Sequence, residues 1–144
     1  MKGTKNDMSE LIDRLRRYAV IQWEILRNDC VEMARYNEGS FSRGFVSGQM
    51  NEGKRIIADI QSTFPDLDKS MASGVPIETL NEYASRQGDA LRKNKGDFKG
   101  LAEGSYDHAF TCGMIKRGEQ AIINLYVTCP ELGDVEGVPE VWQI

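Results

Sequence analysis

The chain has 144 residues, with 18 basic and 22 acidic side chains, one histidine and three cysteines. This length suits a single domain, which can bury roughly 68–70% of its unfolded surface and needs neither a metal nor disulfides to fold. No apolar run approaches the roughly 18 residues of a membrane helix, and residues 1–9 are too polar for a signal peptide. The odd number of cysteines, without C-x-x-C spacing, favours reduced thiols in a bacterial or host cytoplasm.

An internal repeat with an offset of 65 residues runs through most of the chain. At this offset, 17 of 58 positions are identical between residues 10–67 and 75–132, with no insertion. Average amino-acid usage would give roughly three to five. The clearest match places Glu38–Phe41 on Glu103–Tyr106. The repeat predicts a duplication: one domain, 1–144, with units 8–67 and 73–132, a linker at about 66–75 and a tail, 133–144.

Each unit is predicted to be a helical hairpin. Its first half carries residues at 3-4 spacing, the pattern of one packed helix face. In the two units this seam consists of Ile12, Leu15, Ala19, Gln22, Leu26, Asp29, Met33 and Tyr36, and of Ile77, Leu80, Ala84, Gln87, Leu91, Asn94, Phe98 and Leu101. We therefore expect an all-α fold, a pseudo-two-fold four-helix bundle followed by a short irregular acidic tail.

Matching turn and cap signals divide each hairpin into two helices. A glycine fits the end of the first helix, the serine after it fits the N-cap of the second, and a proline ends the second helix. These residues are Gly39, Ser40 and Pro65 in the first unit and Gly104, Ser105 and Pro130 in the second.

The first helix of the chain is expected to be straight and about 45 Å long at 1.5 Å per residue, with Ser9 as a plausible N-cap. Pro76 fits the first turn of the third helix. Lys93–Gly100 contains two glycines where Asn28–Arg35 has none, so the third helix is expected to bend or break there.

Retained residues inside the helices indicate close packing about the repeat axis. A helix-interior glycine costs about 1 kcal/mol relative to alanine, so Gly48, Gly53, Gly113 and Gly118 predict a close helix crossing or, alternatively, a cleft where a ligand approaches the backbone. The seam also contains Gln22 and Gln87. Because a buried amide needs a partner, the two amides are expected to bond each other across the axis; the alternative is a contact to a ligand.

No catalytic motif stands out, so we expect no enzyme activity, cofactor or metal. His108 and Cys112 are four apart on a predicted helix, which would suit a thiolate–imidazolium pair or half of a metal site. The first unit has Arg43 and Ser47 at these positions, and no second histidine exists. A surface histidine near a small apolar thiol is the simpler interpretation.

The leading hypothesis is a non-catalytic interaction protein, an inhibitor or adaptor that binds a larger macromolecular partner. Residues 103–144 carry two basic and seven acidic side chains, and the chain ends in an acidic segment with a tryptophan. That tryptophan either ties the terminus to the bundle or anchors it to another protein. The expected partner-binding residues are Trp142, Ile144, Glu136 and Glu140. Small acidic proteins of phages and mobile elements that act on host factors offer an analogy.

Two other classes of partner stay open. A small anionic ligand could be bound or sequestered near the repeat axis by Gln22, Arg27, Gln87 and Arg92, since a guanidinium suits carboxylate and phosphate. Nucleic acid could contact two basic clusters, but a net charge of −4 and interleaved acids disfavour this. The clusters are Arg14, Arg16 and Arg17 beside Tyr18, and Arg92, Lys93, Lys95 and Lys99 around Phe98. We also expect a homodimer, because long hairpins can exchange between protomers.

Overall fold

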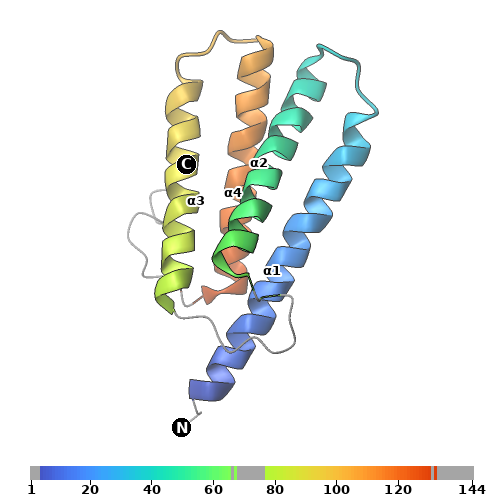
Figure 1. The fold of residues 1–144 in the computed structure, drawn as a ribbon. Coiled ribbons are helices and arrows are strands. Elements are labelled where there is room, and N and C mark those ends of the chain that lie inside the picture. Colours follow the sequence, from blue (N-terminus) through green and yellow to red (C-terminus); the bar gives the residue numbers. More distant parts are fainter. Residues whose placement is uncertain (1–3, 66, 68–76, 131, 133–144) are drawn as a thin grey trace.

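The computed structural model describes residues 4–65, 67, 77–130 and 132, and the regular elements within them are all helices (Figure 1). The four helices are α1 (Thr4–Met33), α2 (Phe41–Thr63), α3 (Ile77–Phe98) and α4 (Tyr106–Thr128). They form the predicted all-α bundle of two hairpins, with both hairpin turns at the same end (Figure 1). The described helices include none that is both long and apolar enough to cross a membrane.

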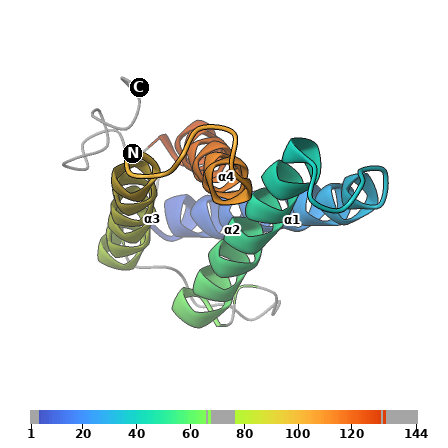
Figure 2. The same cartoon turned by 90° about the horizontal axis from the view of Figure 1, so that it is seen from above.

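The second helix of each hairpin, α2 or α4, lies at the centre of the bundle. α2 and α4 make the most extensive contact, α1 packs mainly on α2, and α3 packs mainly on α4. Seen from above, the helices splay in different directions rather than lying parallel (Figure 2). Each hairpin thus contributes one helix to the central pair, and its first helix packs mainly on that helix. The starts of α2 and α4 differ by 65 residues, the offset of the sequence repeat. The duplication itself stays a prediction.

Both hairpin turns have the geometry that the cap signals predict. Gly39 and Gly104 have φ of +79° and +83°, a left-handed conformation that glycine adopts without steric cost. The hydroxyls of Ser40 and Ser105 each accept a 3.1 Å hydrogen bond from the backbone N–H three residues later. These contacts satisfy one free N–H at the start of α2 and one at the start of α4.

The predicted close crossing joins α2 to α4. A Cβ atom added to Gly48 would lie 1.8 Å from the carbonyl oxygen of Phe110, and one added to Gly113 would lie 1.9 Å from that of Phe45. The two contacts are related by the repeat offset. Any side chain at either glycine would therefore push the two backbones apart.

The length and start of α1 and the continuity of α3 can be compared with the sequence predictions. α1 has 30 residues, which gives about 45 Å at 1.5 Å per residue. It begins at Thr4, so Ser9 lies inside the helix and the predicted N-cap is wrong. The predicted break in α3 is also wrong, because the helix is continuous through Gly96 to Phe98. Gly96 is exposed with no atom within 4 Å of its Cβ position, so only its propensity cost opposes the helix. Pro76 lies outside the described residues.

The apolar core occupies the end of the bundle opposite the hairpin turns. It combines the early turns of α1 and α3 with the late turns of α2 and α4, and it includes Leu67 and Leu132 beyond the helices. At the edge of the core nearer the hairpin turns, the hydroxyls of Tyr18 in α1 and Tyr83 in α3 share a 2.8 Å hydrogen bond. Burial, the largest influence, raises the pKa of both phenols, so both stay neutral at physiological pH.

Candidate functional site

The acidic tail predicted to bind a partner lies outside the described residues. This applies to Trp142, Ile144, Glu136 and Glu140, so their predicted role stays a prediction.

The predicted amide pair across the axis is replaced by two amide–arginine contacts. Gln22 accepts a 2.7 Å hydrogen bond from Nη1 of Arg117 through its side-chain oxygen, and its backbone carbonyl accepts from Nη2 at 3.2 Å. Arg117 is fully buried and lies against Gly53. On the other side, Gln87 accepts from Nη2 of Arg55 at 2.8 Å. A guanidinium is a stronger donor than an amide, which accounts for this choice of partner.

The buried polar contacts between the helices include two residues of opposite charge at positions that the repeat aligns. Glu52 corresponds to Arg117 at the repeat offset, is 1% exposed and lies against Gly118. Its carboxylate binds Arg55 with both oxygens, at 3.0 and 2.8 Å. Burial opposes the charge of Arg55, but the bond and charge of Glu52 raise its pKa above the usual value. Arg55 thus links the buried acid to Gln87 and completes a polar layer above the apolar core.

The four residues proposed to bind an anionic ligand do not form one site. Gln22 and Gln87 are buried and already bonded, whereas Arg27 and Arg92 are exposed on the outer sides of α1 and α3. Arg92 is moreover paired with Asp89, three residues earlier. The four residues of the anionic-ligand hypothesis are therefore divided between the interior and two separate surfaces.

A single carboxyl near Arg117 makes stability depend on pH. Asp29 is 8% exposed, and burial, opposed by Arg117 and reinforced by Glu32, raises its pKa from 3.8 to about 6. Protonation of Asp29 therefore favours folding, and this contribution is present below pH 3.8 and lost as the pH rises through about 6. We expect Asp29→Asn to be more stable than the parent by about 1–3 kcal/mol at pH 8, with the difference fading towards pH 4.

Denaturant unfolding of the two proteins between pH 4 and 8 measures this difference. The chain offers a matched control, because the position equivalent to Asp29 holds Asn94, which is 7% exposed. Asn94→Asp should destabilise the protein at pH 8 and should recover at low pH. A parallel pH dependence of Asp29→Asn and the parent would contradict the assignment.

The remaining polar candidates have structural partners. The ring of His108 stacks on Phe98 with a centroid distance of 4.4 Å, and no group of three potential metal ligands occurs among the described residues. In the basic cluster near Phe98, Lys93 pairs with Asp97 and Lys95 with Glu119. Local ion pairs therefore offset much of the charge that nucleic-acid binding would need.

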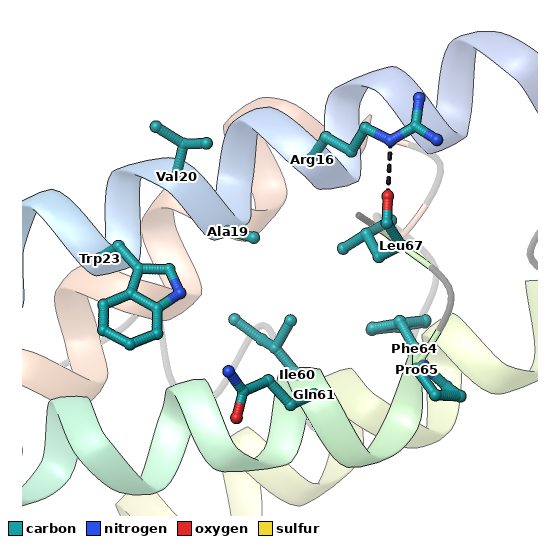
Figure 3. Close-up of a pocket in the computed structure, with 9 residues that line it drawn as sticks. All are labelled: Arg16, Ala19, Val20, Trp23, Ile60, Gln61, Phe64, Pro65 and Leu67. Atoms are coloured by element: carbon teal, nitrogen blue, oxygen red, sulfur yellow. Dashed lines mark hydrogen bonds between the residues drawn. The ribbon is translucent and has the colours of Figure 1, made fainter. Parts of the chain in front are cut away.

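An open apolar pocket lies between α1 and α2, beside Trp23 (Figure 3). Its volume is about 390 Å³. We call it the Trp23 pocket, and it is lined by Arg16, Ala19, Val20, Trp23, Ile60, Gln61, Phe64, Pro65 and Leu67. The indole of Trp23 extends from α1 towards α2, and Ile60 extends towards α1 (Figure 3). Trp23 is 48% exposed and Val20 is 53% exposed, so much of this apolar surface faces solvent.

A hydrogen bond fixes one end of the Trp23 pocket. Nε of Arg16 donates to the carbonyl oxygen of Leu67 at 2.6 Å, which ties Leu67 to α1 (Figure 3). Because Leu67 is buried in the apolar core, this end of the pocket is anchored to the rest of the fold. The pocket is thus built from two helices and residues that follow α2, of which Leu67 is tethered.

The second hairpin places its large side chain differently. At the positions equivalent to Trp23 and Gln61 it has Gly88 and Tyr126, so the large ring belongs to α4 instead of the outer helix. Tyr126 packs against Leu91 and Ile122, and Gly88 is buried. The fold therefore accommodates this position without an exposed indole, which indicates that Trp23 is not required for the bundle itself.

Sequence analysis missed Trp23 because it lies off the buried seam of α1. One signal could have found it: a tryptophan aligned with a glycine in a repeat that otherwise retains seam residues. Comparison with protein-family models, with curated proteins and with solved structures finds no match for this chain.

Proposed function

We propose that this protein is a non-catalytic helical binding protein, an adaptor or inhibitor whose Trp23 pocket receives an apolar side chain from a protein partner. The observation that carries the proposal is a half-exposed tryptophan beside an open apolar pocket of about 390 Å³. Tryptophan is enriched among the residues that dominate binding energy at protein interfaces. Its large, stiff ring loses little conformational entropy when a partner covers it.

The chemistry of the lining supports binding rather than catalysis. The nine described lining residues provide one arginine and one amide, and none of them is an acid, imidazole or thiol. General acid–base or nucleophilic catalysis would need such groups at the site. What this lining offers is burial of apolar surface, at about 25 cal/mol per Å² of area removed from water.

Contacts within the free protein hold the walls of the Trp23 pocket in place. Arg16 holds Leu67 in place, and the core beneath it is closed by Phe64 and Leu67. A partner therefore meets a formed pocket and loses little affinity to rearrangement of the chain. These contacts support a binding role for the first hairpin.

Selection of binders from a displayed peptide library tests the proposal. We expect selected peptides to carry a large apolar residue and to bind at least tenfold more weakly to Trp23→Ala, because the half-exposed indole forms one wall of the pocket. Fluorescence polarisation with labelled peptides gives the affinity. Circular dichroism should show a nearly unchanged melting temperature, since Trp23 is already half exposed.

Val127→Ala is the matched control, because Val127 is an exposed apolar residue of α4, 74% exposed and remote in sequence from the pocket. Its affinity for the same peptides should equal that of the parent. Equal binding to Trp23→Ala and to the parent would place the interaction elsewhere and refute the proposed role of the pocket.

A further inference from the structure

The outer face of α1 carries a second stripe at coiled-coil spacing, in addition to its buried seam. We define this outer stripe as Arg16, Val20, Trp23, Arg27 and Cys30, which follow one another at intervals of four, three, four and three residues. All but Arg16, which is half-buried, are exposed. This spacing places side chains in the line that a packed second helix contacts.

The equivalent line on α3 has a different chemical character. Its members are Asn81, Ser85, Gly88, Arg92 and Lys95. Both helices hold the same place in their hairpins, so the bundle does not need apolar residues there. The exposed apolar side chains of the outer stripe are thus specific to α1, and three stripe members, Arg16, Val20 and Trp23, line the Trp23 pocket.

The charges of the outer stripe are both positive, on a chain with a net charge of −4. Arg16 bonds the carbonyl of Leu67 and lies 3.3 Å from the exposed carboxylate of Asp13. Arg27 has neither a hydrogen bond nor an ion pair within the part of the chain that the structure describes, although Glu24 lies three residues earlier. Its equivalent, Arg92, is paired. Arg27 is therefore an uncompensated cation one turn from Trp23.

These charges discriminate between possible occupants of the stripe. The stripe itself holds two arginines and no carboxylate, so a second copy packed stripe to stripe would bring like charge against Arg27, which costs free energy. A helix with a carboxylate beside its apolar residues would instead pair with Arg27, which has no acidic partner among the described residues. Charge complementarity therefore favours a different protein over a second copy.

We propose that the partner of this protein is an acidic amphipathic α-helix that lies along the outer stripe. The inference rests on the proposed function, and it specifies the partner. One large apolar side chain of that helix enters the Trp23 pocket, and a flanking carboxylate meets Arg27. From Arg16 to Cys30 the stripe spans about 21 Å at 1.5 Å per residue, which corresponds to about four helical turns of the partner.

The experiment compares two charge reversals at equivalent positions. Peptides of about 20 residues are selected on the parent protein from a library without imposed charge, and their affinities are measured for Arg27→Glu and for the control Arg92→Glu. We expect the selected peptides to be acidic, to become helical on binding by circular dichroism, and to bind Arg27→Glu at least tenfold more weakly. Arg92→Glu should stay within twofold of the parent. Exchanging peptide glutamates for lysines should restore binding to Arg27→Glu.

Three results would overturn the inference, and each is distinct from failure of the proposed function. One result is that selected peptides need Trp23 for binding but show no excess of acidic residues, or lose the same affinity for Arg27→Glu as for Arg92→Glu. Either finding would be consistent with binding at the pocket but would show that the partner need not be acidic. Peptides that bind without becoming helical would show that the partner does not bind as an α-helix. A dimer in sedimentation that disappears with Trp23→Ala would show that a second copy occupies the stripe.

Discussion

Replacing Gly48 with alanine is expected to cost at least about 3 kcal/mol of folding free energy, and Gly113→Ala should cost a similar amount. The new methyl group would lie 1.8 Å from a backbone oxygen of α4, and that atom cannot move without the helix. Relief requires α2 and α4 to separate along the most extensive contact in the bundle. Overpacking of a flexible side chain costs about 1–3 kcal/mol, and a backbone contact is less forgiving.

Urea unfolding of the purified variants measures this loss, and Gly96→Ala is the control. Gly96 also lies inside a helix, but no atom lies within 4 Å of its Cβ position. Alanine there should therefore stabilise the protein by about 0.5–1 kcal/mol through helix propensity alone. If Gly48→Ala and Gly96→Ala shifted stability in the same direction, the close crossing would be wrong.

Replacing Gln22 with leucine is expected to cost about 3–5 kcal/mol, because it leaves a fully buried guanidinium without its side-chain acceptor. Burial already lowers the pKa of Arg117, so the folded protein accommodates this charge only with its present partners. The backbone carbonyl of Gln22, at 3.2 Å, would be the one acceptor left among the described contacts of Arg117.

A double-mutant cycle separates the missing bond from a general packing defect. It is best carried out with Asp29→Asn, so that removal of Arg117 does not leave a buried carboxylate without its cation. In that background Gln22→Leu combined with Arg117→Met should be more stable than Gln22→Leu alone, since no buried charge remains. Losses that simply add in thermal or urea unfolding would show that the two side chains are not coupled.

The parts of the fold that the sequence predicted correctly are governed by local rules. Glycine with positive φ, serine as N-cap and proline after the last turn act within a few residues, so Gly39, Ser40 and Pro65 mark boundaries without knowledge of the partner helix. The crossing at Gly48 was also predictable. A glycine that costs helix stability in both units indicates that another backbone lies close by.

The errors arose where neighbours in space outweigh local pattern. Two glycines predicted a break in α3, but the helix packs along α4 and tolerates Gly96 in an exposed turn. The amides of Gln22 and Gln87 were predicted to pair, and each instead accepts from an arginine. Nothing in the sequence marks Arg117 as buried, since arginine is mostly a surface residue.

The sequence by itself determined the number of helices, their boundaries at the turns and the glycines at which α2 meets α4, because spacing and backbone preference act along the chain. Only the tertiary structure revealed the Trp23 pocket and the neighbouring outer stripe. Whether an indole at this position is buried or open depends on what the facing helix presents, and α2 presents Gln61 where α4 has Tyr126. The exposure of Trp23 thus depends on Gln61, which lies 38 positions later in the sequence. No local sequence pattern could therefore predict it.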